Sequence, residues 1–281
     1  MVIFKKTEDL QVYLKDQRKN GKTVGFVPTM GALHNGHTSL VGISHTAGDL
    51  VVCSIFVNPT QFNDKADFEK YPISLDEDIA LLLAANCDVL FLPSVAGMYP
   101  NGTKEGSNYD LGYLDTVFEA AHRPGHFKGV VQIVSKLLDA VEPDNLYMGQ
   151  KDFQQCMVIK KMLELDGRST QMHICPTQRE ADGLAMSSRN RRLTEPQRAL
   201  AGIIYQCLVS IQTKKDSGNF EVVQKECIDL LKHKGLEPDY VALANAKDLT
   251  TLNNYDSSKE MVALIATRVG NNRLIDNMIL Q

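Results

Sequence analysis

Two histidines three positions apart follow an apolar run near the start of the chain. The segment PTMGALHNGHTSLV (28–41) contains His34 and His37, with Gly36 between them and Gly31 upstream. A strand, a glycine-containing turn and a helix in this order can bind a phosphate, because backbone N–H groups and the helix dipole favour an anion at the start of a helix. Two imidazoles at that place can donate hydrogen bonds to phosphate oxygens and stabilise charge that develops during phosphoryl or adenylyl transfer.

Two other interpretations of the histidine pair stay open at this point. His34 and His37 could be two ligands of a metal ion, although no third ligand of useful spacing lies nearby in the sequence. They could also cap the following helix, which we expect to begin between Asn35 and His37, or pack against it. The histidines at 45 and 173 are interpreted as ordinary surface or core residues.

A lysine and an aspartate lie at a second predicted strand-to-helix junction, in the segment MGQKDFQQ (148–155). Lys151 can hold phosphate oxygens as a point charge. Asp152 can support Mg²⁺ through an oxygen or a bound water, and it is also a plausible N-cap of the helix that follows. Gln155 lies one helical turn after Lys151 and therefore on the same face. This junction predicts a second group of phosphate ligands.

A loop of small and hydroxyl residues precedes several arginines in EADGLAMSSRNRRLT (180–194). Ser187 and Ser188 can wrap triphosphate oxygens, and Arg189 can neutralise a leaving pyrophosphate. The alternative is a plain solvated loop.

Two amides follow the second apolar run, in SIFVNPTQFN (54–63). Asn58 and Gln61 carry neutral groups that can bind the hydroxyl and carboxylate groups of a small substrate. Asn58 precedes a proline, so it could instead serve only the turn itself.

The elements that must position these residues alternate between short apolar runs and helical patterns over the first 175 residues. Strands are predicted at 23–29, 49–57, 87–93, 145–149 and 171–176. Helices are predicted at 75–86, opened by a capping box of Ser74 and Glu77, at 129–141 and at 152–163. This order favours an α/β fold with a Rossmann-like, doubly wound parallel sheet covered on both faces, which binds ligands at the carboxyl ends of its strands.

Beyond residue 176 the pattern changes. One amphipathic helix is predicted at 195–212 and another at 218–232, followed by strands at 238–246 and 259–270. We therefore expect two domains, a Rossmann-like domain at 1–175 and a smaller C-terminal α+β domain at 176–281.

The composition is that of an ordinary globular chain and excludes several classes of function. The 281 residues are 43% hydrophobic, which is enough to bury a sizeable core, and their net charge of −4 argues against a general binder of nucleic acid or anionic membranes. No apolar run approaches the roughly 18 residues of a membrane helix, and the start lacks the apolar segment of a signal peptide. No two of the six cysteines are closer than the 19 positions from Cys156 to Cys175, so CxxC patterns are absent. We expect a soluble, cytoplasmic protein with buried free thiols.

Several of these segments carry a family resemblance. HNGH resembles the HxGH signature of the nucleotidyltransferase superfamily, whose members use ATP and react at its α-phosphate, and the loop with Ser187 to Arg189 resembles its KMSKS-type second signature. The whole set resembles the pantothenate synthetase (pantoate–β-alanine ligase) family, in the family's order and over about two-thirds of the chain. The matching segments are PTMGALHNGH, FVNPTQFN, YP at 71–72, MYP at 98–100, RPGHFKGVV at 123–131, GQKDFQQ and READGLAMSSRN. The terminal RLIDNMIL is also similar to the family.

The resemblance implies an ATP-dependent ligase that condenses pantoate with β-alanine through a pantoyl adenylate, releasing pyrophosphate and then AMP. It implies ATP and Mg²⁺ as co-substrate and metal, a homodimer, and a C-terminal domain that acts as a lid. Catalysis is assigned to His34, His37, Lys151 and Arg189, with His37 as the proton donor. The residues expected to bind ATP are Met30, Gly31, Ala32, Leu33, His34, Asn35, Gly36, His37, Gly149, Gln150, Lys151, Asp152, Gln178, Met186, Ser187, Ser188 and Arg189. Those expected at the pantoate and β-alanine sites are Gln61, Gln155, Asn58, Tyr71 and Arg123, and Asp152 is the expected metal ligand.

The sequence departs from the family pattern at two places. Gln150 stands where many members have glutamate, and Ala121 and His122 replace a more polar segment. The second departure concerns the wall before Arg123 and not the reaction.

Two alternative functions come from different classes. One is another HxGH enzyme, an adenylyltransferase that keeps AMP in its product, although such enzymes do not share NPTQFN and KDFQQ in this order. The other is a nucleotide-binding module without catalysis, which has no reason to keep His34, His37 and Lys151 together. The length and acidic balance argue against a tRNA synthetase.

Overall fold

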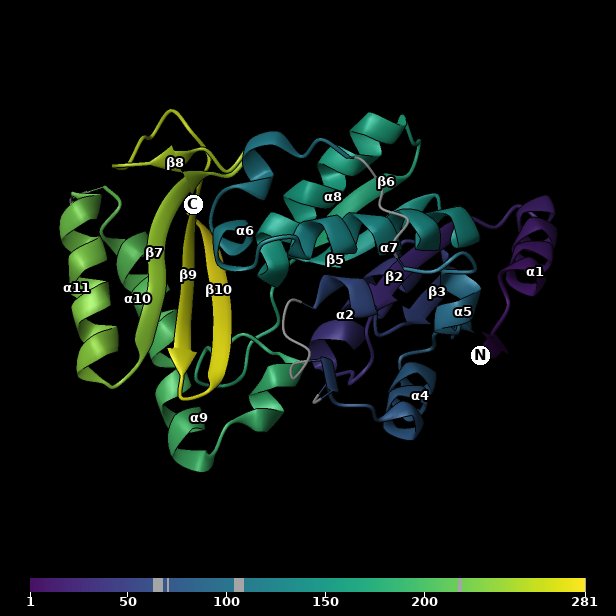
Figure 1. The fold of residues 1–281 in the computed structure, drawn as a ribbon, viewed down its shortest axis with the longest axis horizontal. Coiled ribbons are helices and arrows are strands. Elements are labelled where there is room, and N and C mark those ends of the chain that lie inside the picture. Colours follow the sequence, from purple (N-terminus) through teal and green to yellow (C-terminus); the bar gives the residue numbers. More distant parts are fainter. Residues whose placement is uncertain (63–67, 70, 104–108, 217–218, 281) are drawn as a thin grey trace. The chain divides into compact units, whose positions relative to one another are not determined.

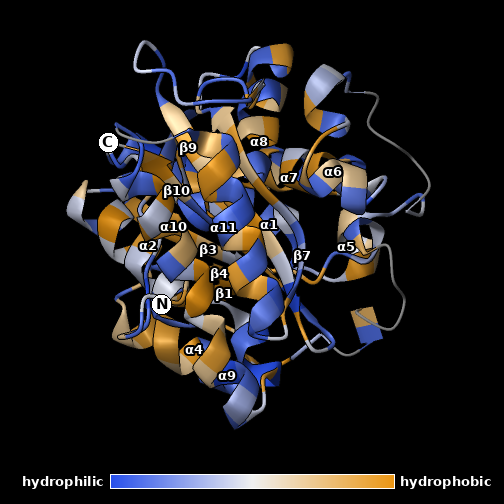
Figure 2. Cartoon of the chain, turned by 90° about the vertical axis from the view of Figure 1, so that its left-hand side faces the viewer, coloured by the Kyte–Doolittle hydropathy of each residue, from blue (hydrophilic) through white to orange (hydrophobic). Residues whose placement is uncertain are grey.

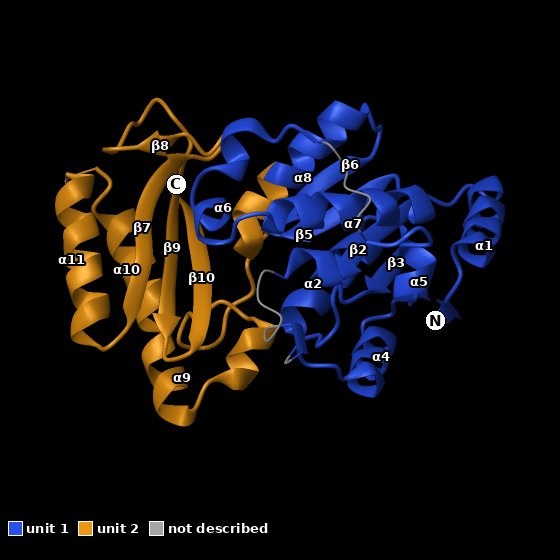
Figure 3. Ribbon diagram, viewed as in Figure 1, with its two compact units in different colours: residues 1–149, 158–175 blue, residues 150–157, 176–281 orange. Residues whose placement is uncertain are grey.

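The computed structural model describes residues 1–62, 68–69, 71–103, 109–216 and 219–280. The chain divides into two compact units, shown in different colours in Figure 3. The first unit comprises Met1–Gly149 and Val158–Cys175, and the second comprises Gln150–Met157 and Pro176–Gln281. The chain thus passes into the second unit after Cys175, and the short segment that contains Lys151 also groups with that unit.

The first unit contains a parallel sheet of six strands (Figure 1). The strands are β1 (Val2–Phe4), β2 (Val24–Thr29), β3 (Leu50–Ile55), β4 (Val89–Phe91), β5 (Asn145–Gly149) and β6 (Gln171–Cys175). The inner strands β2, β3 and β4 are buried along almost their whole length, which explains why continuous apolar runs mark them in the sequence. The predicted Rossmann-like, doubly wound sheet is confirmed, with β1 as an additional edge strand.

The order of the strands across the sheet reverses between β2 and β5. The order across the sheet is β1-β4-β3-β2-β5-β6, so β2 has β3 on one side and β5 on the other. In such sheets ligands bind outside the carboxyl ends of the strands at the reversal. Because β2 ends at Thr29 and β5 ends at Gly149, the turn with His34 and His37 and the segment starting at Gln150 both leave the sheet there.

Helices connect these strands. They are α1 (Thr7–Lys19), α2 (Asn35–Thr46), η1 (Pro59–Gln61), α4 (Leu75–Ala84), α5 (Val95–Met98), η2 (Gly112–Asp115), α6 (Glu119–His122), α7 (His126–Val141) and α8 (Phe153–Asp166). Apolar side chains of α2 and α4 pack with those of the sheet in one core cluster, and α7 contacts β2 and α1. The predicted helices at 129–141 and 152–163 are confirmed with shifted ends, and α2 begins at Asn35 as expected.

The predicted capping box before α4 is wrong. Helix α4 begins at Leu75, as predicted, but the Ser74 side chain does not cap it. The Ser74 hydroxyl donates instead to Asp78 Oδ1 at 3.2 Å. The hydroxyl is turned toward the Asp78 carboxylate, and its oxygen does not accept from a backbone N–H of the first turn of α4.

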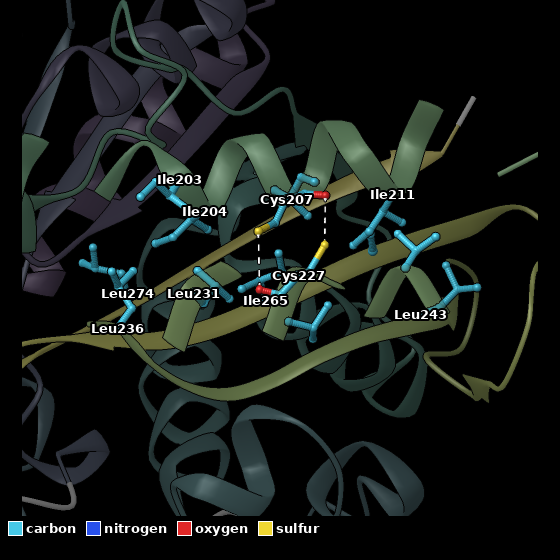
Figure 4. Close-up of a cluster of buried hydrophobic side chains, with 14 of the residues drawn as sticks. Ile203, Ile204, Cys207, Ile211, Cys227, Leu231, Leu236, Leu243, Ile265 and Leu274 are labelled. Carbon is cyan, nitrogen blue, oxygen red and sulfur yellow. Dashed lines mark hydrogen bonds between the residues drawn. The ribbon is translucent and has the colours of Figure 1, made fainter. Parts of the chain in front are cut away.

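The second unit is an antiparallel sheet with helices. Its helices are η3 (Gln150–Asp152), η4 (Ser188–Arg192), α9 (Glu195–Ala201), α10 (Ile203–Thr213) and α11 (Phe220–His233), and its strands are β7 (Glu237–Asn245), β8 (Thr251–Leu252), β9 (Met261–Val269) and β10 (Asn272–Leu280). The strand order is β10-β9-β7-β8. Figure 4 shows α10 and α11 contributing buried residues to one cluster with the sheet, including Cys207 and Cys227. Figure 2 shows apolar and polar residues interleaved along helices such as α11, whose buried residues recur every three or four positions.

The single helix predicted at 195–212 is two helices, with Gly202 between α9 and α10. A Cβ at Gly202 would lie 2.9 Å from Asp182 Oδ2, so a side chain there would require Asp182 to shift. Asp182 in turn accepts a hydrogen bond from Arg198 Nη2 at 3.0 Å. This close approach is a tertiary feature that the local pattern does not encode.

Two further observations bear on the sequence expectations. All six cysteines are buried as free thiols. Among the described residues, no helix is long and apolar enough to cross a membrane.

Candidate active site

The turn after β2 is held by a buried carboxylate from α4. Gly31 and Ala32 both have positive φ, 80° and 50°, which is an unfavourable conformation for alanine. Asp78 Oδ2 accepts a hydrogen bond from the Ala32 N–H at 2.9 Å, and Oδ1 accepts from the Leu33 N–H at 2.7 Å. The Asp78 side chain is only 1% exposed, so water does not compete for these bonds. Asp78 therefore fixes the backbone that leads to His34 and His37.

We predict that Asp78→Ala lowers the free energy of unfolding by about 3–6 kcal/mol, since each of two charge-assisted bonds contributes about 1.5–3 kcal/mol. Asp78→Asn keeps the shape but replaces one acceptor oxygen by a donor, so its loss should be intermediate. Asp76→Ala is the matched control, because Asp76 lies exposed in the first turn of the same helix. Urea denaturation followed by circular dichroism measures the three changes, and equal losses for Asp76→Ala and Asp78→Ala would contradict the assignment.

Each of the two histidines uses its own Nδ1 atom to cap the start of α2. His34 Nδ1 accepts a hydrogen bond from the Gly36 N–H at 3.1 Å, and His37 Nδ1 accepts from the His34 N–H at 3.3 Å. The ring centroids lie 4.0 Å apart, and both side chains are half-buried. A ring nitrogen that accepts carries no proton, so each neutral imidazole has its proton on Nε2. The pair thus combines the helix-capping role with two Nε2–H donors on the other side of the rings.

This geometry changes which groups of the turn can meet a phosphate. The N–H groups of Ala32, Leu33, His34 and Gly36 all donate to protein acceptors. An anion at this turn would meet the imidazoles rather than these backbone amides, which differs from the general expectation for a helix start. As for a metal, no cluster of three or more His, Cys, Asp or Glu side chains suited to an ion occurs within the described ranges.

Gln61, the predicted pantoate ligand, is oriented from three directions. Its Nε2 donates to Met30 Sδ at 3.0 Å, and its Oε1 accepts from Asn58 Nδ2 at 3.2 Å. The backbone carbonyl of Gln61 lies 2.8 Å from His126 Nδ1, which must donate because a carbonyl only accepts. The Gln61 side chain is 9% exposed. The structure therefore brings Met30, Gln61 and Asn58 together in the first unit.

Asn58 is itself fixed by protein partners. Its Nδ2 also donates to the Gly129 carbonyl of α7 at 3.0 Å, and its Oδ1 accepts from the Tyr99 hydroxyl at 2.7 Å. Burial raises the pKa of Tyr99 above its ordinary value, so the hydroxyl keeps its proton for this bond. Asn58 also caps η1 by accepting from the Thr60 N–H at 3.4 Å. Its direct contact with substrate stays a prediction, and its turn role is the one the structure displays.

The last two predicted substrate residues of the first unit lie in different surroundings. Tyr71 is buried, with its ring edge-on to Phe62 at 5.7 Å between centroids. Arg123 is half-buried at the end of α6, and its carbonyl accepts from the His126 N–H at 3.0 Å. Both lie next to elements that hold Gln61.

In the second unit, the predicted phosphate ligands begin at η3. The Lys151 side chain is 17% exposed and that of Asp152 is 50% exposed, and Lys151 Nζ lies 3.5 Å from Asp152 Oδ1. Helix α8 begins at Phe153, so Asp152 immediately precedes it as expected. Gln155 is half-buried in the first turn of α8. The ammonium and the carboxylate are thus neighbours that can act on one phosphate chain and its cation.

The other predicted ATP ligands of the second unit lie in the segment 178–189, whose beginning is joined to its later part by a backbone hydrogen bond. The Met186 N–H donates to the Gln178 carbonyl at 2.9 Å, which joins two residues expected to contact the nucleotide. Ser187 caps η4 by accepting from the Arg189 N–H at 3.2 Å. Ser188 is buried and Arg189 is half-buried. The alternative of a plain solvated loop does not describe this segment.

Four residues that organise the site are absent from the sequence prediction. Asp78 and His126 act in the first unit, as described above. In the second unit, Asn277 of β10 contacts η3, which carries Lys151, and Asp276 contacts Arg179, which precedes the loop with Arg189. Two segments that resemble the family contain three of these residues: His126 lies in RPGHFKGVV, and Asp276 and Asn277 lie in RLIDNMIL. No local sequence pattern indicated a role for Asp78.

Comparisons with known proteins identify the family. A family model described as pantoate-beta-alanine ligase matches residues 2–279. The pantothenate synthetase of Porphyromonas gingivalis is 43% identical over 281 residues, which cover 99% of each chain. A crystal structure of the Thermus thermophilus pantothenate synthetase is similar with a TM-score of 0.92 and 35% identity, covering 100% of this chain and 99% of that one.

A crystal structure of the Francisella tularensis pantoate-beta-alanine ligase, complexed with beta-gamma ATP and beta-alanine, has a TM-score of 0.83 and 36% identity over 99% of this chain and 97% of that one. The family resemblance carried by the motifs is thereby confirmed over the full length and not only from 28 to 190. With sequence and fold in agreement, the chain belongs to the pantoate–β-alanine ligase family.

Proposed function

We propose that this chain joins pantoate to β-alanine at the expense of ATP, through a pantoyl adenylate, with release of pyrophosphate and then AMP. The observation that carries the proposal is the imidazole pair at the carboxyl end of β2, with both Nδ1 atoms accepting from backbone N–H groups, in a unit that also buries an oriented Gln61. The full-length similarity to enzymes of this name supports it. So does the relative whose crystal structure contains a form of ATP together with beta-alanine.

In the first step, a carboxylate oxygen of pantoate attacks the α-phosphorus and the bond to the bridging oxygen of pyrophosphate breaks. The carboxylate is already ionised at neutral pH, so the step requires alignment and charge stabilisation rather than a strong base. The Nε2–H groups of His34 and His37 are donors suited to the α-phosphate oxygens, where negative charge increases in the transition state. Lys151 and Arg189 neutralise the phosphates that leave.

Gln61 is prepared for a substrate oxygen. Its Nε2 donates to a thioether sulfur of Met30, which is a weak acceptor. A hydroxyl or carboxylate oxygen of pantoate is a stronger acceptor and can replace that contact. Because Asn58 and His126 hold the other end and the backbone of Gln61, the amide does not have to be ordered when pantoate binds.

In the second step, the neutral amine of β-alanine attacks the acyl carbon, the bond from that carbon to the phosphate oxygen breaks, AMP leaves and the nitrogen releases one proton. The acyl adenylate is prone to hydrolysis, so the first step is productive only where water is kept away from the acyl carbon. The C-terminal domain as a lid belongs to this proposal.

The residues present fit a magnesium ion that arrives with the nucleotide. Mg²⁺ is held in such sites by one or two carboxylates together with substrate phosphates. Asp152 offers a half-exposed carboxylate beside Lys151, which suits a shared cation rather than a fully protein-built cage. When bound, the ion neutralises phosphate charge and orients the leaving pyrophosphate.

A product assay tests the function. With ATP and pantoate alone, we expect pyrophosphate release limited to about one equivalent of enzyme, because the adenylate stays bound. Free AMP should form continuously only when β-alanine is also present, with one pantothenate per AMP by mass spectrometry. A product that retains the AMP moiety would instead assign the chain to the adenylyltransferases, and ATP binding without turnover would indicate a binding module.

Two further parts of the proposal concern the setting. We place the enzyme in the cytoplasm, which the six buried free thiols support because disulfides are rare there. We also propose a homodimer, as the family resemblance implies.

A further inference from the structure

Two consecutive residues of the last strand contact η3, which carries Lys151, and Arg179, which precedes the loop that carries Arg189. Asp276 and Asn277 lie in β10 and are 3% and 1% exposed. Side chains of consecutive strand residues point to opposite faces, so the two can contact different segments. Such a buried polar pair in a strand requires partners on both sides.

Asn277 holds the turn that carries Lys151. Its Nδ2 donates to the Gln150 carbonyl at 2.9 Å and to the Lys151 carbonyl at 2.8 Å. Its Oδ1 accepts from Gln150 Nε2 at 3.2 Å. Both amide protons are thus used on two consecutive carbonyls of η3, more than 120 positions away in the sequence. This bonding fixes the backbone from which the Lys151 side chain extends.

Asp276 holds the second segment through Arg179. The Asp276 Oδ2 accepts from Arg179 Nη1 at 2.6 Å, and its Oδ1 accepts from Nη2 at 3.1 Å. The guanidinium also donates to the Gly183 carbonyl at 2.9 Å and to the Asn277 carbonyl at 3.2 Å. Its Cζ lies 4.5 Å from the centroid of the Tyr205 ring. A bidentate, stacked arginine of this kind is a rigid connection.

Arg179 directly precedes the loop that returns to Arg189. It forms an antiparallel bridge with Ala185, and the adjacent Gln178 carbonyl accepts from the Met186 N–H at 2.9 Å. Asn190 Nδ2 donates to the Ala185 carbonyl at 3.0 Å. The position of Arg179 therefore sets the position of the start of the 186–189 loop.

We propose that Asp276 and Asn277 are positioning residues for ATP, which set the Lys151 turn and the 186–189 loop relative to one another. This inference rests on the proposed function in taking the two segments as nucleotide ligands. It gives a role to the RLIDNMIL segment, which contacts no substrate in the proposal. Misplaced phosphate ligands make weaker contacts with ATP, so loss of either bond set should be visible in nucleotide affinity. Misplacement of reacting groups by about 1 Å can also lower the rate by about a hundredfold.

The test compares Asn277→Ala with Gln224→Ala. Gln224 is a matched control because its Nε2 also donates to a backbone carbonyl of the same unit, that of Val241 at 2.6 Å, away from both segments. For Asn277→Ala we expect the Kd of a non-hydrolysable ATP analogue, measured by calorimetry without pantoate, to rise at least tenfold. The KM for pantoate should stay within twofold. A merely structural role would reduce the active fraction in both assays and leave the Kd and both KM values unchanged.

A second pair of variants tests the Asp276 branch. Asp276→Asn weakens the bidentate contact with Arg179, and Asp239→Asn is its control, since Asp239 accepts from Arg273 Nε at 2.6 Å in the same sheet. We expect the nucleotide Kd to rise at least fivefold in the first variant and less than twofold in the second. If Asn277→Ala is recovered unfolded, Asn277→Ser, which keeps one donor, is measured in its place.

The outcomes separate this inference from the proposed function. Wild-type protein that binds the analogue but does not release AMP would overturn the proposed reaction, while weaker binding by Asn277→Ala would still support the positioning role. A folded Asn277 variant with a wild-type Kd and a wild-type KM for ATP would overturn the positioning role, even if the reaction is confirmed.

Discussion

We expect His37→Ala to lower the turnover of pantothenate formation by at least about a hundredfold, the loss seen when one preorganised donor to a developing negative charge is removed. In the proposed mechanism His37 supplies an Nε2–H donor, while its Nδ1 accepts from the His34 N–H at 3.3 Å. The alanine variant loses both contacts, so His34 also loses a contact that orders its backbone. We expect the loss to fall mainly on kcat, because charge on the α-phosphate is greatest in the transition state.

Two substitutions of His37 distinguish its role as an Nε2–H donor from its role as a cap of α2. Asn can imitate the Nδ1 acceptor of His37 and Gln the position of its Nε2 donor. His37→Asn should therefore keep the thermal stability of the wild type and lose activity, whereas His37→Gln should keep more activity and lose part of the cap. His45→Ala, an exposed histidine on the same helix, is the control and should keep its rate within about twofold. Steady-state kinetics by AMP release measures all four, and near-normal turnover of His37→Ala would remove the residue from the mechanism.

The inner strands β2, β3 and β4 of the first sheet were predictable because of their burial. A parallel strand covered on both faces is apolar at every position, and β2, β3 and β4 show this burial. β1 has only three residues, and Val2 and Ile3 are 44% and 43% exposed. So short and exposed an edge strand leaves no periodic signal.

In the second unit, two features could not be predicted from the local sequence pattern: β10 and the break between α9 and α10. β10 was not predicted, because Arg273, Asp276 and Asn277 interrupt the apolar pattern of its sequence. These polar residues are buried or half-buried by partners far away in the chain, such as Arg179 and Gln150. The close approach of Asp182 to Gly202, the residue between α9 and α10, likewise involves a partner that no window around residue 202 contains.

The candidate site shows the same difference between local sequence patterns and contacts made by distant residues. The types of group at 34, 37, 151 and 189 were visible in the sequence, because each lies in a short motif with its own chemistry. The groups that orient them were not visible, because Asp78 bonds Ala32 across 46 positions and Asn277 bonds Lys151 across 126. Local patterns therefore indicate candidate reacting groups, while the residues that hold them in place become evident only in the folded chain.

Lys151→Ala should lower kcat/KM for ATP by at least about a hundredfold, since removal of a preorganised charge at a leaving group has an effect of this size. The ammonium is the one group of η3 that can neutralise phosphate oxygens directly, and its side chain is only 17% exposed, so its field is less screened than that of a surface lysine. The Asn277 amide fixes the Lys151 carbonyl at 2.8 Å, which keeps the backbone in place when the side chain is truncated. The loss should therefore reflect the missing charge rather than a displaced turn.

The matched control is Lys160→Ala, an exposed lysine on α8, which begins directly after η3. It removes the same charge from the same part of the chain, and we expect kcat/KM within about twofold of the wild type. Lys151→Arg keeps the charge but replaces a compact ammonium by a planar fork, so it should recover only part of the rate. If the ammonium acts on the departing pyrophosphate, kcat falls and the KM for ATP changes little, whereas a role in binding the ground state raises the KM. Equal kinetics for Lys151→Ala and Lys160→Ala would show that phosphate charge is neutralised by other groups.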